Sequence, residues 1–253
     1  TYVLPVTIKS VEGIGVLQSA KTYYYVFRGA SLINVVCNIS RNRAYPDFKN
    51  DSKFNNLTEN TMEILFKANS FPNTLNTLMG IESNYLLRIG DATIPNNQLQ
   101  VATSVNNCTS ADLQLESGKW YHVAVAFNKG NVKVYINGVE KLSGSTGKSS
   151  VSLGAKHTNE EDGSRCFWVG YSYKDDRYFD GVVSEVRIWN RALTAEEIQA
   201  TNHFYTIEPE SEGLIAYWKF DEGSGTVAKD YSVSGYDLTI EKEPKWESVS
   251  LPQ

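Results

Sequence analysis

Aromatic and charged side chains are concentrated in one loop, at residues 167–181, which reads FWVGYSYKDDRYFDG. A sugar ring has an apolar face on which an aromatic ring can stack, and its hydroxyls need amide, carboxylate or guanidinium partners. This loop supplies both kinds of group. The residues predicted to bind a sugar here are Tyr171, Tyr173, Asp175, Arg177 and Tyr178, with Asp176 as a further polar group.

A second loop, at residues 40–51, has the same character. It reads SRNRAYPDFKND and contains Tyr45 and Phe48. In both loops the aromatic rings have an alternative role, because tyrosines often do no more than fix a loop to the edge of a fold. A single sequence does not show which rings cluster, so both roles stay open.

Paired acids suited to catalysis are not found. Retaining hydrolysis of a glycosidic bond needs two carboxyl groups roughly 5 Å apart. Glu63 is alone in its expected strand, Glu185 has no acidic residue two positions away, and the acidic run at 160–162 lies in a polar loop. The histidines are scattered along the chain, and they are His122, His157 and His203. The chain is therefore predicted to be non-catalytic, with His122 as a structural strand residue.

Composition argues against two classes of partner. The chain has 253 residues and a formal net charge of −5 with both signs interspersed, so nucleic-acid binding is not expected. No apolar run approaches the roughly 20 residues that cross a bilayer as a helix. Cys37, Cys108 and Cys166 form neither a metal motif nor a dense disulfide framework. They are predicted to be buried thiols, with one disulfide and one thiol as the alternative.

The elements that position these loops are expected to be β-strands. In residues 120–127, Tyr121, Val123 and Val125 alternate with small or aromatic side chains, and residues 132–136 repeat the alternation. Asn137-Gly138 supplies a tight turn, because both residues accept the positive φ that a hairpin needs. Many short strands indicate a sandwich or barrel, and the others are expected at 32–39, 61–67, 75–80, 85–89, 99–105, 167–170 and 181–189.

One helix is expected, directly after Leu193. Thr194 is a suitable N-cap, Glu197 completes a capping box, and Leu193 with Ile198 forms a hydrophobic staple. Residues 141–165 are polar and are expected to form a surface loop. The tail from residue 213 is too short to bury a core of its own, so strands at 214–220 and 236–240 are predicted to pair within the same sandwich.

Three segments resemble the laminin-G-like domain of the concanavalin A-like lectin/glucanase group. They read GKWYHVAVAFNKGNVKVYINGVE, FDGVVSEVRIWNRALTAEEIQ and GLIAYWKFDEGSGTVAKDYSVSGYDLTI. The resemblance implies an all-β fold for residues 29–253, a jelly-roll sandwich of two antiparallel sheets with one short helix. In the family the AYWKFDEGSG strand normally opens the domain, whereas here it follows the helix.

Residues 1–28 resemble a different domain. YVLPVTIKSVEG and KTYYYVF are similar to the tail of a small β-sandwich domain of unknown function, which precedes laminin-G-like domains in surface proteins of gram-negative gut bacteria. The segment is therefore expected to be the C-terminal remnant of an upstream domain, either orphaned or docked on the larger sandwich. The abrupt start at Thr1 predicts that a longer chain precedes it.

Calcium is the one cofactor that the resemblance implies. Relatives hold this ion through Asp side chains and backbone carbonyls, and the candidate ligands here are Asp230 and Asp237 in KDYSVSGYD. Relatives often read DSSGNGNDG at this point, whereas this chain has Val233 and Ser234 in place of the Asn residues. The alternative is an Asx turn in which Asp230 accepts backbone N–H groups.

Together these features predict a non-catalytic carbohydrate-binding module of an exported protein, at the cell surface or in the periplasm of a gram-negative bacterium. The expected partner is a glycan or polysaccharide, bound reversibly by rim loops or by a concave sheet face. Two alternatives are a glycoside hydrolase of the same fold and a protein-adhesion or spacer module. A cleft with facing carboxylates would favour the first, and a flat rim without exposed aromatic rings the second.

Overall fold

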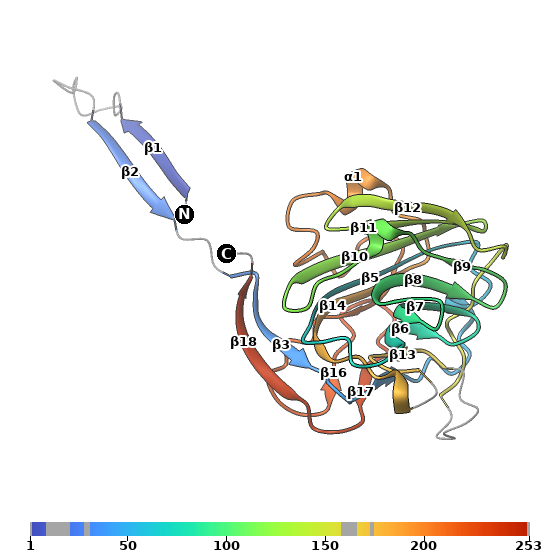
Figure 1. The fold of residues 1–253 in the computed structure, drawn as a ribbon. Helices are drawn as coiled ribbons and strands as arrows, with labels where there is room; N and C mark the ends of the chain where they lie inside the picture. Colours follow the sequence, from blue (N-terminus) through green and yellow to red (C-terminus); the bar gives the residue numbers. More distant parts are fainter. Residues whose placement is uncertain (1, 9–20, 28–30, 158–165, 173–174, 252–253) are drawn as a thin grey trace.

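The computed structural model describes residues 2–8, 21–27, 31–157, 166–172 and 175–251. Two large antiparallel sheets stack face to face as a sandwich (Figure 1). Strands β1 (Tyr2–Ile8) and β2 (Lys21–Phe27) pair with each other in a separate two-stranded sheet. The predicted all-β jelly-roll class, with one short helix, is therefore confirmed.

Sheet I, the first of the two large sheets, has eight strands. Its order is β12-β11-β10-β5-β14-β3-β18, and β15 pairs with β14 beside this path. The strands are β3 (Ile33–Asn38), β5 (Glu59–Ala68), β10 (Trp120–Asn128), β11 (Asn131–Ile136), β12 (Val139–Ser145), β14 (Gly181–Trp189), β15 (Leu214–Trp218) and β18 (Lys245–Leu251).

Sheet II, the second, also has eight strands, in the order β16-β17-β4-β13-β6-β7-β8-β9. They are β4 (Ala44–Pro46), β6 (Asn76–Ile81), β7 (Tyr85–Asp91), β8 (Ile94–Thr103), β9 (Asn107–Cys108), β13 (Trp168–Val169), β16 (Val227–Ala228) and β17 (Leu238–Ile240). Three single-turn 3₁₀ helices lie in the connections, namely η1 (Ser52–Phe54), η2 (Ala111–Leu113) and η3 (Asp175–Arg177).

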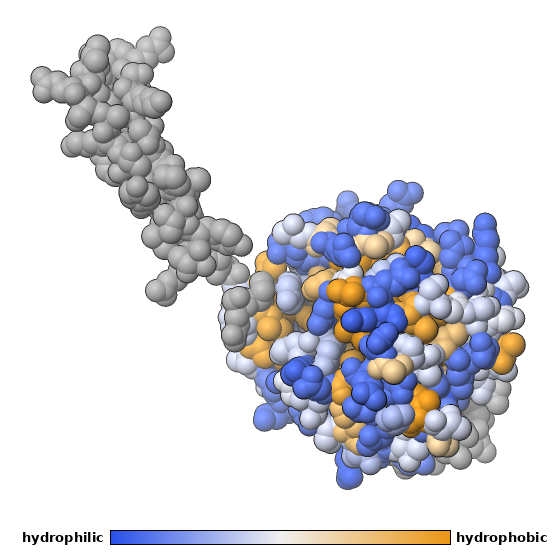
Figure 2. All heavy atoms as spheres, turned by 45° about the horizontal axis from the view of Figure 1, so that its top comes forward, coloured by the Kyte–Doolittle hydropathy of each residue, from blue (hydrophilic) through white to orange (hydrophobic). Residues whose placement is uncertain are grey.

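The main core lies between the two sheets, because each strand alternates its side chains between the inner and outer face. Ile64, Val125 and Val183 reach it from sheet I, and Leu87 and Val101 reach it from sheet II. Figure 2 shows the complementary outer surface, where hydrophilic residues are interspersed with small apolar patches over the face in view.

A second apolar cluster covers the outer face of sheet I. Helix α1 (Ala195–Ile198) and the chain on either side of it pack Leu193 and Ile198 against Ala124 and Trp189. Thr194 caps the helix and forms the predicted capping box with Glu197. The helix, its cap and the buried staple residues are therefore confirmed.

Both tight turns of the central hairpin are confirmed. Lys129 and Gly130 join β10 to β11, and Asn137 and Gly138 join β11 to β12, with positive φ at all four residues. The predicted pairing of the C-terminal tail is confirmed as well. Strand β15 pairs with β14 in sheet I, and β17 pairs with β4 in sheet II.

Some sequence expectations were wrong. Residues 141–145 belong to strand β12 instead of a loop, because they pair along the edge of β11. Strand β18 was not predicted, yet it pairs with β3 at the other edge of sheet I. In contrast, the prediction for the cysteines is confirmed, because all three are buried free thiols.

Among the described residues, no helix is long and apolar enough to cross a membrane.

Candidate functional site

Aromatic side chains gather on the outer face of sheet II, where β4 and β13 lie side by side. In β4, Ala44 joins the main core, so Tyr45 points to the outer face. In β13, Val169 joins the core and Trp168 points outward. We call this group the rim cluster, and its members are Tyr45, His157, Trp168, Tyr171 and Tyr178.

The rings of the rim cluster are in contact one after another. Tyr45 stacks on His157 with centroids 3.5 Å apart and planes 6° from parallel. Trp168 meets both of these rings edge-on, at 5.2 and 5.1 Å. Tyr171 lies 5.1 Å from Trp168, and Tyr178 lies 4.8 Å from Tyr171. The cluster therefore ends at Tyr178, which is half-buried.

Arg43 joins the rim cluster to the neighbouring loop. Its guanidinium lies 5.3 Å from the ring centroid of Trp168 and 4.7 Å from that of Tyr171. The same guanidinium forms an ion pair with Glu241, directly after β17. A cation over an aromatic face is favourable, and the carboxylate fixes its position.

Three polar atoms around the cluster are buried and have no hydrogen-bond partner within the part of the chain that the structure describes. They are Nε of Arg43, Nε1 of Trp168 and Nε2 of His157. An unpaired buried polar group is costly, and such groups are rare in folded proteins. Of these three residues, Arg43 also lines a cleft beside the cluster.

A cleft of about 820 Å³ lies beside the cluster. Arg43, Tyr178 and Glu241 line it together with Asn73 and Asp180. The Asn73 amide donates to the Tyr178 carbonyl at 2.9 Å. The Asp180 carboxylate accepts from hydroxyls of the Ser40 and Ser70 side chains. The lining thus combines the half-buried aromatic residue Tyr178 with several polar groups, a combination typical of sugar-binding sites.

The predicted binding residues of the 167–181 loop do not all reach the cleft. Tyr178 lines the cleft, whereas Tyr171 is only 3% exposed and lies behind it, so it does not present a free ring as expected. Arg177 pairs with Glu82 at 2.8 Å. Asp175 begins η3, and nothing further is described of it. Tyr173 lies outside the described residues.

The two aromatic residues of the second predicted loop, at residues 40–51, lie in different places. Tyr45 belongs to the rim cluster, but Phe48 is fully buried in the main core and is not available to a ligand. The sequence analysis did not single out Arg43 or Asp180, although both lie in the two predicted loops. Strand alternation was a usable signal for Trp168, because its neighbour Val169 continues a core pattern. Nothing local in the sequence marks Asn73, which the fold brings to the cleft from another segment.

The predicted calcium ligands hold a turn. Asp230 Oδ1 accepts the backbone N–H groups of Tyr217 and Ser232 at 3.0 and 2.8 Å, and its Oδ2 accepts that of Tyr236 at 2.8 Å. The Asp230 N–H donates to Asp237 Oδ1 at 2.8 Å. Burial raises the pKa of Asp230 above its ordinary value. These contacts fit the Asx-type turn, and the calcium site stays a prediction.

The prediction that the histidines are scattered is wrong for two of them. His122 and His203 come together with Glu63 beneath the α1 region, on the far side of the sandwich from the rim cluster. Among the described residues these three side chains form the one group with potential metal-ligand atoms within 4.8 Å of one another.

Comparison with known proteins agrees with this fold. The family described as the concanavalin A-like lectin/glucanases superfamily matches residues 42–199. This match does not extend to residues 1–28, so the nature of that segment stays a prediction. No curated protein matches the chain.

Among solved structures, one similar protein comes from Bacteroides ovatus and has carbohydrate binding ascribed to it. It is 25% identical with a TM-score of 0.73, and the match covers 94% of this chain and 66% of that one, just under two thirds of its length.

Two further structures show weaker likeness. A pentraxin of Limulus polyphemus is 14% identical over 69% of this chain and 84% of its own, with a TM-score of 0.47. Domain 4 of an extracellular arabinanase from Geobacillus stearothermophilus, solved with arabinotriose, is 19% identical over 80% of this chain and 82% of its own, with a TM-score of 0.47.

Proposed function

Because the chain belongs to the concanavalin A-like lectin/glucanases superfamily, we propose that it is a non-catalytic carbohydrate-binding module of an exported, cell-surface bacterial protein. The superfamily includes both lectins and glucanases, so membership alone does not choose between binding and hydrolysis. The similarity to the Bacteroides ovatus protein, to which carbohydrate binding is ascribed, supports the choice of binding.

The observation that carries the proposal is the cleft beside the rim cluster. Tyr178 offers its ring to the apolar face of a sugar, while Asn73 and Asp180 lie within the same cleft for its hydroxyls. Arg43 is held in place by Glu241 and by the ring of Tyr171. A ligand that enters the cleft would meet a pre-formed set of groups, which lowers the entropic cost of binding.

Binding at this cleft is expected to be weak for a single sugar. Each sugar hydroxyl exchanges a hydrogen bond with water for one with the protein, and the net gain is only about 1 kcal/mol. The stacked ring adds a contribution of similar size, about 0.5–1.5 kcal/mol. Useful affinity would therefore come from several sugar units along a chain, or from several modules on one surface.

The test is a glycan array followed by affinity gels that contain the polysaccharides detected. The wild-type chain is compared with Tyr178→Ala and with Tyr231→Ala as a matched control. Tyr231 is also half-buried, but it packs against Tyr217 on the other sheet. Tyr178→Ala is expected to weaken binding about fivefold or more, and Tyr231→Ala to leave it unchanged.

Three outcomes would overturn the proposal. The first is equal retention of wild type and Tyr178→Ala on every positive gel, which would remove the cleft as the binding site. The second is release of reducing ends from a bound polysaccharide, which would make the protein a hydrolase. A chain that binds no glycan on the array would also reject the proposal and favour the adhesion or spacer role.

A further inference from the structure

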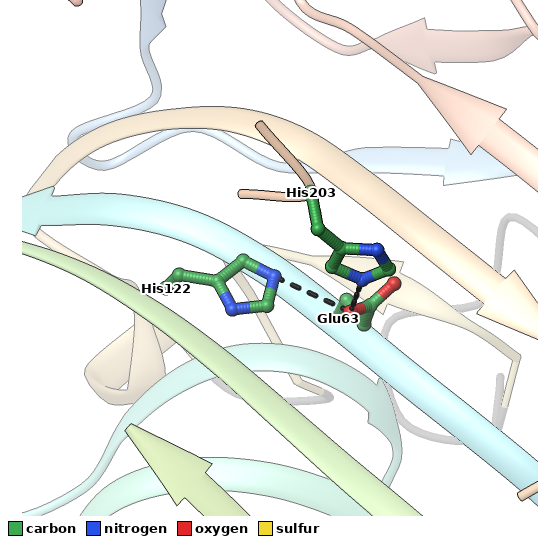
Figure 3. A group of neighbouring side chains, drawn as sticks. All are labelled: Glu63, His122 and His203. Atoms are coloured by element: carbon green, nitrogen blue, oxygen red, sulfur yellow. Dashed lines mark hydrogen bonds and ion pairs between the residues drawn. The ribbon is translucent and has the colours of Figure 1, made fainter. Parts of the chain in front are cut away.

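Glu63, His122 and His203 meet on the outer face of sheet I (Figure 3). Glu63 lies in β5 and His122 in β10. Glu63 is paired with Ala124, two positions along from His122, so the two side chains are diagonal neighbours on one face. His203 reaches them from the segment that follows α1. Glu63 and His122 have no exposed surface, and His203 is 8% exposed.

One carboxylate oxygen faces both imidazoles. Glu63 Oε1 lies 2.7 Å from His203 Nε2 and 3.3 Å from His122 Nε2. In a four-coordinate zinc site with bonds of 2.0–2.1 Å, neighbouring ligand atoms lie about 3.3 Å apart. The His122 distance already has this value. The His203 distance would have to open by roughly 0.6 Å, within the reach of a side chain on a loop.

The other oxygen of the Glu63 carboxylate contacts neighbouring polar side chains. Glu63 Oε2 accepts a hydrogen bond from Trp189 Nε1 at 2.7 Å and lies 3.7 Å from Arg187 Nη1. The same Arg187 Nη1 donates to the His203 carbonyl at 2.6 Å. Partners of this kind orient metal-binding carboxylates and histidines in known sites. They leave Oε1 directed at the two histidine rings.

Within the described part of the chain, the polar ring of His122 is buried without the hydrogen bonds that such a ring normally makes. Among the described residues, neither of its buried ring nitrogens has a hydrogen-bond partner, and Nε2 lies 3.3 Å from the Glu63 carboxylate as an ion-pair contact. The ring is covered by Phe204, whose centroid is 4.6 Å away. An unpaired imidazole in such a place is costly, so a missing partner for its Nε2 atom is expected.

The charge around the cluster favours a cation. Two buried carboxylates, Glu63 and Glu185, share one buried guanidinium, Arg187.

We propose that Glu63 Oε1, His122 Nε2 and His203 Nε2 form a structural site for a divalent zinc-type ion. Two histidines and one glutamate are a ligand set known from zinc sites in which water fills the fourth position. Because all three residues are buried, the site proposed here is structural. The ion would replace the hydrogen now shared between Glu63 and His203. It would fasten the segment after α1 onto sheet I, far from the glycan cleft.

The test uses the full chain, refolded with zinc chloride because the site is closed in the native fold. After free metal is removed, about one zinc ion per chain is expected in the wild type. His157→Gln is the matched control, because His157 belongs to the rim cluster, and it should bind the same amount. His122→Gln and His203→Gln should each retain less than about a tenth as much.

Cobalt gives a second readout that does not depend on variants that fold. Wild type refolded with cobalt chloride should show the strong visible absorption of four-coordinate cobalt, without the near-ultraviolet band of cobalt–thiolate bonds. Zinc content near zero in the wild type would overturn the proposal. Zinc content in both histidine variants equal to that of the wild type, or a thiolate band from the three cysteines, would overturn it as well.

Discussion

The guanidinium of Arg43 lies 4.7 Å from the ring centroid of Tyr171, over a ring that is itself almost fully buried. Through this contact a charged group from the chain just before β4 is fixed against a loop that follows β13. The same guanidinium forms the ion pair with Glu241. One side chain therefore links three segments that border the cleft, and its loss should be felt in both stability and binding.

Replacement of Arg43 tests this link. Arg43→Ala should lower the free energy of unfolding by about 1–2 kcal/mol, because it removes a largely desolvated cation–π contact and an ion pair together. Arg43→Lys keeps the charge but loses the planar group, so its loss should be smaller. Urea unfolding measures both variants. An Arg43→Ala protein as stable as wild type would contradict the link.

Substitution of Tyr171 should mainly affect stability, whereas substitution of Tyr178 should mainly affect glycan binding. Tyr171 is buried, so Tyr171→Ala should cost about 2–4 kcal/mol of unfolding free energy through the cavity it leaves. Tyr178 is half-buried and lines the cleft, so Tyr178→Ala should cost less stability but weaken glycan binding. Urea unfolding and affinity gels measure the two effects. The reverse pattern would show that Tyr171 contacts the ligand directly.

Glu222 provides a prediction about pH. Its Oε1 accepts the Lys229 N–H at 2.7 Å, but its Oε2 is buried and has no hydrogen-bond partner among the residues that the structure describes. Burial raises the pKa of Glu222 above its ordinary value of 4.5, so the fold favours the protonated form. Its contribution to stability should therefore improve as pH falls from neutrality through the raised pKa, and level off below 4.5.

Glu222→Gln removes this titration while its amide oxygen can still accept the Lys229 N–H. The variant should be more stable than wild type at pH 7, by about 0.5–1 kcal/mol, and the difference should shrink in acid. Melting curves of both proteins across the acidic range measure it. A constant difference at every pH would show that Glu222 does not titrate in this way.

Asp230 is expected to hold its turn through backbone contacts. In Asp230→Asn the amide oxygen can still accept two N–H groups, but the amide nitrogen would face the N–H of Tyr236. Two donors face to face should cost about 1–3 kcal/mol. The same melting experiment tests the calcium prediction, because a bound ion would make calcium raise the melting temperature of wild type but not of Asp230→Asn.

Much of the fold could be predicted from sequence because its signals are local. Apolar residues alternate along β10 and β11, an Asn-Gly turn joins β11 to β12, and the helix begins with a capping box. Strand β18 gave no such signal. It reads KWESVSL, has no fully buried residue, and is defined by its partner β3 at the opposite end of the chain.

The candidate sites were harder to predict, because their residues meet only through tertiary structure. The aromatic loop at 167–181 was recognised from composition, but the burial of Tyr171 behind Tyr178 depends on Trp168 and Arg43. Glu63 and His203 lie 140 positions apart. Knowledge of the β5–β10 register would have placed Glu63 beside His122, but nothing local indicates that His203 folds over them.

The pairing of β3 with β18 also determines how the sandwich would respond to mechanical force. Ile33 is opposite Leu251 and Asn38 is opposite Lys245, so the first and last strands of the sandwich leave it side by side at one edge. A pull on both would unzip this pair one hydrogen bond at a time, starting from Ile33 and Leu251. The layers that carry the cleft would stay outside the path of the load until that edge had opened.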